Sequence, residues 1–288
     1  MTPLPVAAAP VLSFPPHATQ VHPTAIVEPG AQLGYGVQVG PWCHVGPQAC
    51  IGDGTRLMSH VVVEGDTRIG AGVTLFPFAT VGLAPQDLKY KGEPTRCEVG
   101  DRTQVREHCT INRGTVTGTG ATTVGADCLL MAVVHVAHDC AIGDGVIIAN
   151  NVVMGGHVTI GAGAVIGGAA ALHQFVRIGR GAMVGGVSGV EADVIPFGSV
   201  LGNRARLLGL NVIGLRRRGV DRTGLQSLRA AVRRLFGPDE VFSARLAEVR
   251  AAHTADPLVM ELLAFMDAPS KRGLIRAELA GLDDADAG

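Results

Sequence analysis

The sequence predicts a mainly β protein, a parallel β-helix of hexapeptide repeats followed by an α-helical C-terminal domain. Three observations lead to this prediction: an aliphatic residue recurs every six positions, the 288 residues include 40 glycines, and aromatic residues make up only 4%. A six-residue repeat with frequent glycine is typical of short strands joined by tight turns. A helix would instead space its apolar residues by 3.6 positions and would tolerate few of these glycines.

The repeat keeps its six-residue phase over most of the chain. Its first members are Leu33, Val39, Val45, Ile51, Leu57, Val63, Ile69, Leu75 and Val81. The phase resumes at Val99, shifts once by one position between Thr117 and Thr123, and then continues to Val190. We expect these side chains to point inward and to form one continuous core along the stacked coils.

An interruption of 18 residues separates Val81 from Val99 and preserves the phase, so we expect a loop that bulges out of the coil. Its charged residues suit a position at the solvent edge. Loops on a rigid scaffold are often where binding groups are placed.

The six-residue pattern stops after Pro196, and two later stretches, 225–236 and 241–249, have helical spacing with one apolar face each. We therefore expect a β-helix over residues 21–203 and a helical domain over 204–288. Residues 1–20 are expected to be a disordered tail. The apolar, proline-rich start of this tail lacks a preceding Lys or Arg, which disfavours a secretory signal.

The segment from Arg204 to Arg234 contains nine arginines and a single acid, Asp221, and so predicts a patch of about +8. A diphosphate or an acidic protein surface could bind there. Nucleic acid is disfavoured because no aromatic platform accompanies the charge and the whole chain has a formal charge of −1.

The longest apolar run, from Ile160 to Leu172, is too short to cross a membrane. The six cysteines contain no Cys-x-x-Cys pair and indicate reduced core residues in a cytoplasmic protein.

The candidate chemistry lies in the segment from Met131 to Cys140, where His135 and His138 are three residues apart and Asp139 is adjacent. If three hexapeptides form one triangular coil, residues 18 apart lie on one face and are separated by about 4.8 Å. His157 and His173 then fall near His138 on later coils. A single histidine would more often be a packed or surface residue, but three beside a carboxylate favour proton transfer near neutral pH.

The chain contains a series of specific motifs in order, which include Val21-His-Pro-Thr-Ala-Ile-Val, Pro85-Gln-Asp-Leu-Lys-Tyr-Lys-Gly-Glu-Pro-Thr, Thr110-Ile-Asn-Arg-Gly-Thr, His135-Val-Ala-His-Asp-Cys, His173-Gln-Phe, Gly209-Leu-Asn-Val-Ile-Gly-Leu-Arg-Arg-Arg-Gly and Arg272-Gly-Leu-Ile-Arg. These motifs closely resemble those of one family, the UDP-N-acetylglucosamine acyltransferases that begin lipid A synthesis. The resemblance covers about residues 21 to 277. It implies a left-handed coil and a homotrimer with active sites between neighbouring subunits.

The resemblance also implies a reaction, in which a 3-hydroxyacyl chain passes from acyl carrier protein to the glucosamine 3-position of UDP-N-acetylglucosamine. It implies that His138 is the general base, that Asp139 orients it, and that the backbone N–H of Gly156 stabilises the oxyanion. No cofactor and no metal are implied. The matching substrate-binding residues are Asp87, Gln86, Lys89, His135, His157, His173, Gln174, Asn211, Arg217 and Arg218. Ile213 departs from a glutamate that some members carry, which puts one nucleotide contact in doubt.

Gly186 matches the residue that ends the acyl-chain groove in the family and so limits the chain length. It lies 48 residues beyond His138, which corresponds to about 2.7 coils and a rise of roughly 13 Å. At about 1.2 Å per bond, we expect a donor of about twelve to fourteen carbons.

Two other functions remain open at this point. One is a hexapeptide-repeat zinc enzyme of the γ-carbonic-anhydrase type, which would use three histidines as ligands. The other is a non-catalytic scaffold that binds a sugar nucleotide. The residues do not distinguish an acceptor with a 3-hydroxyl group from one with a 3-amino group.

Overall fold

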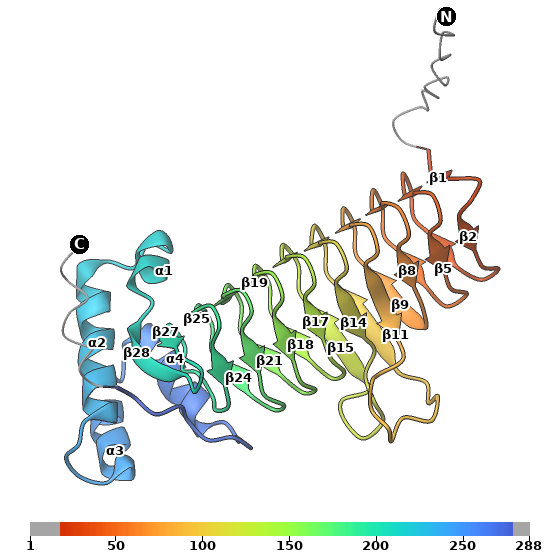
Figure 1. Cartoon of the computed structure of the whole chain (residues 1–288). Coiled ribbons are helices and arrows are strands. Elements are labelled where there is room, and N and C mark those ends of the chain that lie inside the picture. The colour runs from red at the N-terminus through yellow and green to blue at the C-terminus, as the bar shows by residue number, and fades with distance from the viewer. Residues whose placement is uncertain (1–17, 279–288) are drawn as a thin grey trace, which may run out of the picture.

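The computed structural model describes residues 18–278. The expected tail over residues 1–20 lies outside this range except for its last three residues. Over residues 18–278 the chain forms an elongated left-handed parallel β-helix, with four α-helices gathered at its C-terminal end (Figure 1). The predicted fold class is therefore confirmed.

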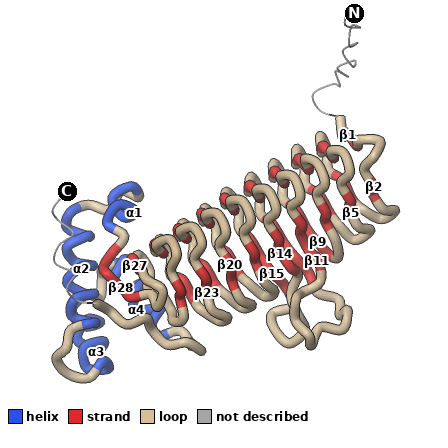
Figure 2. Tube along the Cα trace, viewed as in Figure 1, coloured by secondary structure: helices blue, strands red, loops and turns tan. Residues whose placement is uncertain are grey.

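Within residues 18–278, three sheets form the sides of the β-helix, and the chain visits them in turn (Figure 2). All strand pairs are parallel except the antiparallel pair of β27 and β28 at the end of the first sheet. The first sheet contains β1 (Gln20–Val21), β4 (Gln38–Val39), β7 (Arg56–Leu57), β10 (Thr74–Leu75), β13 (Gln104–Val105), β16 (Leu129–Leu130), β19 (Ile147–Ile148), β22 (Val165–Ile166), β25 (Met183–Val184), β27 (Gly198–Leu201) and β28 (Arg206–Leu210). The second contains β2 (Ile26–Val27), β5 (His44–Val45), β8 (Val62–Val63), β11 (Thr80–Leu83), β14 (Thr110–Asn112), β17 (His135–Val136), β20 (Val153–Met154), β23 (Ala171–Leu172) and β26 (Gly189–Val190). The third contains β3 (Gln32–Leu33), β6 (Cys50–Ile51), β9 (Asp66–Ile69), β12 (Arg96–Val99), β15 (Ala121–Val124), β18 (Ala141–Ile142), β21 (Thr159–Ile160) and β24 (Arg177–Ile178).

The repeated aliphatic side chains point into the β-helix, as predicted. Val45, Leu75 and Ile148, for example, are fully buried. Each such burial stabilises the fold by about 1.5–3 kcal/mol, and parallel pairing with a register of 18 residues stacks these side chains into ladders. All six cysteines are free, and five are buried.

The turns between sheets form three edges, which we name by their residues. The histidine edge joins the second sheet to the third and includes His138, His157 and His173. The glycine edge joins the third sheet to the first and includes Gly163 and Gly181. The aromatic edge joins the first sheet to the second and includes Trp42, His60, Phe78 and His108.

Two loops project side by side from the histidine edge (Figure 1). The first, residues 84–95, is the predicted bulge between β11 and β12. The second, residues 113–120, lengthens the spacing between paired strands from 18 to 25 residues, as in Val105 and Leu130. These seven extra residues are one more than a six-residue repeat, which explains the phase shift of one position in the sequence. Arg113 connects the loops, since its Nε donates to the hydroxyl of Tyr90 at 2.9 Å.

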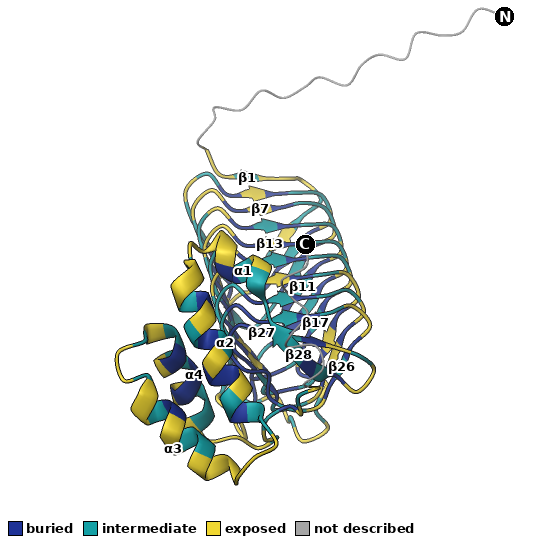
Figure 3. Cartoon of the chain, turned by 90° about the vertical axis from the view of Figure 1, so that its left-hand side faces the viewer, coloured by how far each residue is buried: buried dark blue, intermediate teal, exposed yellow. Residues whose placement is uncertain are grey.

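The C-terminal region contains α1 (Val212–Arg217), α2 (Arg222–Phe236), α3 (Phe242–Ala252) and α4 (Pro257–Asp267). Buried residues of α2 and α4 face the interior of this small domain (Figure 3). The helices predicted at 225–236 and 241–249 correspond to α2 and α3. The boundary expected between residues 203 and 204 falls inside the antiparallel hairpin of β27 and β28, so the first helix begins only at Val212. Among residues 18–278, every helix is too short or too polar to span a bilayer.

Candidate active site

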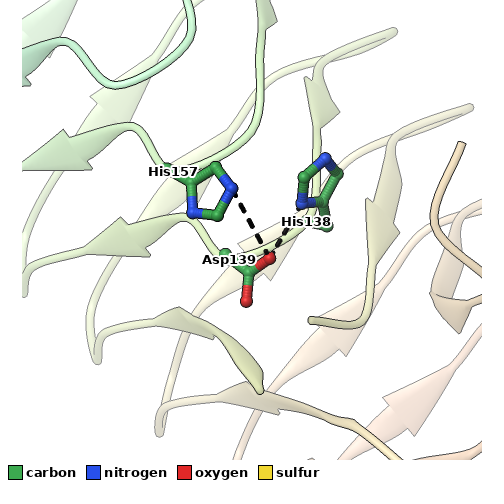
Figure 4. Close-up of side chains that lie close together, drawn as sticks. All are labelled: His138, Asp139 and His157. Carbon is green, nitrogen blue, oxygen red and sulfur yellow. Dashed lines mark hydrogen bonds and ion pairs between the residues drawn. The ribbon is translucent and has the colours of Figure 1, made fainter. Parts of the chain in front are cut away.

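The centre of the histidine edge is a buried pair, His138 and Asp139, in the turn between β17 and β18. Their side chains point toward one another, and His138 Nδ1 lies 2.8 Å from Asp139 Oδ2 (Figure 4). The two residues are 9% and 4% exposed. Partial removal from water strengthens this hydrogen bond and fixes the orientation of the imidazole.

The second loop holds the carboxylate of Asp139. The hydroxyl of Thr115 donates to Oδ2 at 2.6 Å, and the backbone N–H of Thr119 donates to Oδ1 at 2.9 Å. Burial by itself would raise the pKa of Asp139, but the hydrogen bonds from Thr115 and His138 outweigh it and hold this pKa below its usual value. Asp139 is therefore an ionised acceptor, His138 Nδ1 is the donor, and Nε2 of His138 is left as the basic nitrogen.

Sequence reasoning missed Thr115 and Thr119. The phase shift between Thr117 and Thr123 was the signal that a loop begins there. The pattern could not indicate that the loop folds back onto Asp139.

Three residues occupy the same corner of successive coils, and all have left-handed backbones. Their φ angles are 58° for Asp139, 62° for His157 and 69° for Phe175. Residues other than glycine rarely adopt this conformation. The repeat imposes it and thereby stacks the imidazole of His157 on the ring of Phe175, with 4.5 Å between centroids.

His157 completes the cluster, since its ring meets that of His138 edge to face at 5.1 Å and its Nε2 is 3.9 Å from Asp139 Oδ2. Burial lowers the pKa of His157, although the charge of Asp139 acts in the opposite direction. The neutral form of His157 is therefore favoured, and this ring can donate or accept a hydrogen bond without adding charge to the site.

Gly156 leaves the space that the imidazole of His138 occupies. A Cβ on Gly156 would lie 2.5 Å from Cε1 of His138, so any side chain would displace the ring. Within the described part of the chain, the backbone N–H of Gly156 donates to no protein acceptor. It is available to a bound ligand beside the basic nitrogen.

The other residues predicted on this edge surround the pair. Nδ1 of His135 lies 2.7 Å from the hydroxyl of Thr110, and burial lowers the pKa of His135. His173 and Gln174 lie one coil beyond Gly156, and Nδ1 of His173 contacts Arg272. Gln86, Asp87 and Lys89 lie in the first loop, where the carboxylate of Asp87 accepts from the backbone N–H of Lys89 at 3.0 Å.

The remaining predicted residues lie on other edges of the same chain. Asn211 donates from Nδ2 to the carbonyl of Gly181 at 3.0 Å, and Arg218 donates to the carbonyl of Gly163, both on the glycine edge. Arg217 is the exposed last residue of α1, and Ile213 is also exposed. Gly186 lies on the aromatic edge. A single chain therefore distributes the predicted residues over three separate edges.

The nine arginines from Arg204 to Arg234 do not form one unneutralised patch, contrary to the sequence prediction. Arg234 pairs with Glu240 at 2.6 Å and also with Glu248. Arg204 and Arg206 lie on the β27–β28 hairpin, whereas most of the others lie on α1 and α2. Acids that follow later in the sequence neutralise part of the charge, and the folded chain divides the rest.

Across residues 18–278, one group of three potential metal ligands is present, formed by His138, Asp139 and His157. Their ligand atoms lie within 4.8 Å of one another. Oδ2 of Asp139 already accepts hydrogen bonds from Thr115 and His138, and a metal ion would have to displace them. The donor set suits a base supported by a carboxylate at least as well as a metal site.

Comparison with known proteins relates this geometry to one family. Residues 193–275 match the model described as "Udp N-acetylglucosamine O-acyltransferase; Domain 2", and residues 121–156 match "Bacterial transferase hexapeptide (six repeats)". The acyl-[acyl-carrier-protein]--UDP-N-acetylglucosamine O-acyltransferase of Caulobacter vibrioides is 51% identical over 258 residues, which are 90% of this chain and 98% of that protein.

Solved structures agree with this relationship. LpxA, the UDP-N-acetylglucosamine O-acyltransferase of Moraxella catarrhalis, is 42% identical, with a TM-score of 0.86 over 89% of this chain and 99% of that one. The UDP-N-acetylglucosamine acyltransferase of Francisella novicida is 29% identical, with a TM-score of 0.88 over 93% and 99%. The chain therefore belongs to the UDP-N-acetylglucosamine O-acyltransferase family.

Proposed function

We propose that this protein transfers a 3-hydroxyacyl chain from acyl carrier protein to the 3-position of the glucosamine in UDP-N-acetylglucosamine, the first step of lipid A biosynthesis. The observation that supports it best is the buried pair of His138 and Asp139, because acyl transfer to a hydroxyl group needs an oriented base. The 51% identity to a relative named for this reaction supports the choice of substrates.

In the proposed reaction, Nε2 of His138 removes the proton of the sugar 3-hydroxyl as its oxygen attacks the thioester carbonyl. The C–S bond then breaks, and the imidazolium returns the proton to the departing thiolate. Asp139 remains ionised throughout and stabilises the imidazolium through Nδ1. No covalent intermediate with the protein forms.

Negative charge develops on the thioester oxygen when the tetrahedral intermediate forms. The backbone N–H of Gly156 lies beside His138 and has no protein acceptor within residues 18–278. We assign it to this oxyanion, because a fixed donor in a buried site needs no reorganisation during the reaction.

The protein acts as a homotrimer in this proposal. We assign the diphosphate contacts to Arg217 and Arg218 and the uracil contact to Asn211. Asn211 and Arg218 lie against the glycine edge, while the base lies on the histidine edge. Three subunits around a closed axis can bring the two edges together. Exposed apolar side chains on the aromatic edge, including Trp42 at 61%, Phe78 at 47% and Val187 at 75%, favour burial against a partner.

The remaining substrate contacts follow the same arrangement. Gln86, Asp87 and Lys89 of the first loop bind the sugar nucleotide. His135, His157, His173 and Gln174 hold the sugar and the acyl group beside His138. Gly186 ends the acyl groove. We assign the protein to the cytoplasm, where its free cysteines would remain reduced.

The direct test incubates the purified protein with UDP-N-acetylglucosamine and a 3-hydroxyacyl carrier protein, and detects the acylated nucleotide by mass spectrometry. Formation of this product is expected, together with a trimer in sedimentation equilibrium. A protein that binds the nucleotide but makes no product would instead be a scaffold.

The zinc enzyme is tested in the same preparation. Because imidazole and carboxylate carry out the proton transfer in our proposal, prolonged dialysis against a chelator should change acyltransfer by less than about twofold. Loss of activity on chelation, with recovery on adding zinc, would assign His138 and His157 to a metal.

A further inference from the structure

A polar cavity lies at the end of the β-helix, away from His138. It has a volume of about 380 Å³ and lies between the last coil, the β27–β28 hairpin and the segment after α4. Four arginines and one glutamate line it: Arg204, Arg206, Arg272, Arg276 and Glu191. These five side chains together carry a formal net charge of +3.

Within residues 18–278, none of the four arginines of this cavity forms an ion pair with a carboxylate. Nε of Arg272 is buried without a hydrogen-bond partner. Asp193, the buried acid of this coil, is already bound, since Arg177 Nε donates to its Oδ2 at 2.7 Å.

The segment that carries Arg272 and Arg276 is held on both sides. The backbone N–H of Ile275 donates to the carbonyl of Asp193 at 2.9 Å, and that of Leu207 donates to the carbonyl of Arg276 at 3.0 Å. This wall of the cavity is thus built on paired backbone, and an anion could meet the arginines that line it without ordering a loop. An anion would gain several charge-assisted hydrogen bonds at little entropic cost.

The cavity lies next to the candidate active site, because Arg272, which lines it, contacts Nδ1 of His173 through Nη2. We propose that this cavity binds a phosphate group, a ligand for which planar guanidinium groups provide bidentate contacts. Two substrates of the proposed function carry such a group: the phosphopantetheine arm of the carrier protein and the diphosphate of the sugar nucleotide. The assignment to a substrate rests on the proposed function, but phosphate binding itself does not.

The first experiment measures binding of inorganic phosphate to the full chain by isothermal titration calorimetry at low ionic strength. Arg206→Gln and Arg276→Gln should each weaken binding about tenfold, the usual effect of losing one charge-assisted hydrogen bond. Arg206→Lys, which keeps the charge, should retain part of the affinity. Arg56→Gln is the matched control, because Arg56 is an exposed arginine of the first sheet, far along the β-helix.

A second protein, in which Asp283, Asp284 and Asp286 near the end of the given sequence are changed to asparagine, is titrated in parallel. This variant tests whether acidic residues outside the described range compete with phosphate. The proposal is supported if either protein binds phosphate and if that binding weakens in the Arg206→Gln and Arg276→Gln variants. Melting curves show whether all variants fold. If they do, the proposal is overturned when neither protein binds phosphate, or when Arg56→Gln weakens phosphate binding as much as the cavity variants do.

The second experiment separates the two sources by steady-state kinetics. In the Arg206→Gln, Arg276→Gln double variant, KM for the acyl carrier protein should rise about tenfold or more if its arm occupies the cavity. A rise in KM for UDP-N-acetylglucosamine instead would assign the cavity to the diphosphate and would overturn the assignment of that group to Arg217 and Arg218. Unchanged KM values for both substrates beside measurable phosphate binding would indicate an adventitious ion only and would overturn the functional role.

Discussion

The aromatic edge and the histidine edge both stack rings at the left-handed corner of successive coils. On the aromatic edge, His60 lies 4.7 Å from Phe78, and Phe78 lies 4.9 Å from His108. On the histidine edge, His157 lies 4.5 Å from Phe175. The backbone angles are also alike, near 60° in φ. The two edges therefore offer the same residue types in the same local geometry.

They differ in what surrounds the imidazoles. Within the described chain, neither His60 nor His108 has a hydrogen bond from its ring to a carboxylate, and both are exposed. His138 is buried against Asp139, which the second loop holds through Thr115 and Thr119. The comparison teaches that a stacked imidazole becomes a candidate base only when a supported carboxylate fixes its tautomer.

The largest effect is expected from His138→Ala. Turnover should fall by about two to four orders of magnitude, the usual contribution of a positioned general base, while fold and nucleotide binding persist. Single-turnover acyl transfer with saturating substrates measures the chemical step. If His138→Ala remained active, the base would have to be sought elsewhere, and the contrast between the edges would lose its chemical meaning.

Asp139→Asn should have the next largest effect, a loss of about two orders of magnitude in kcat, because an amide cannot stabilise the imidazolium as a carboxylate does. KM for both substrates should change much less than kcat. Equal losses in kcat for Asp139→Asn and Asp139→Ala would indicate that the charge matters, whereas full activity of Asp139→Asn would reduce Asp139 to a packing role.

The same variant has a pH signature. The folded-state pKa of Asp139 is lowered, so its ionised carboxylate stabilises the protein above the unfolded-state pKa of about 3.9. That contribution is lost as the pH falls through the lower folded-state pKa. The difference in Tm between wild type and Asp139→Asn should therefore be largest near neutral pH and should shrink below about pH 4.

Gly186→Met introduces volume on the aromatic edge and should change specificity more than rate. A Cβ on Gly186 would lie 3.3 Å from the carbonyl oxygen of Gly168, and we expect the rest of the methionine side chain to fill part of the proposed acyl groove. The preferred donor should become shorter by about two to four carbons, at about 1.2 Å per bond. Competing donors of graded length measure this preference, and an unchanged profile would exclude Gly186 as the distal stop.

The smallest effect is expected from His108→Ala, the matched control for His138→Ala. Its ring stacks on Phe78 and, among the described residues, forms no hydrogen bond or ion pair with a carboxylate, so kcat should change by less than about twofold. Loss of a contact at the proposed subunit interface should appear as weaker trimer association by sedimentation. A drop in kcat comparable to that of His138→Ala in an intact trimer would show that the edges do not differ in chemistry.

Much of the fold could be predicted from the sequence, because each six-residue unit is a local structure that repeats. An aliphatic residue at each sixth position must be buried, and glycine at frequent turns excludes a helix. The repeat from Leu33 to Val190 therefore predicts which side chains form the core, where the first loop interrupts the coil and where the β-helix ends. The handedness came only from the family resemblance, since spacing alone does not distinguish the two hands.

The predicted catalytic residues were close in sequence, which is why His138 and Asp139 could be found as a pair. Their support was not predictable, because Thr115 and Thr119 reach Asp139 across more than 19 positions through a loop of irregular length. The space above His138 also depends on stacking, since Gly156 is one coil away.

The sequence alone determined the repeat, the inward ladder and the cluster of acid and base residues, because these depend on short-range periodicity. Only the tertiary structure decided which edge each group occupies. It placed Asn211 and Arg218 on the glycine edge, and it gathered Arg206 and Arg276 around one cavity from positions 70 residues apart. Charge counts along the chain cannot predict such distances, because neutralisation depends on which side chains meet after folding.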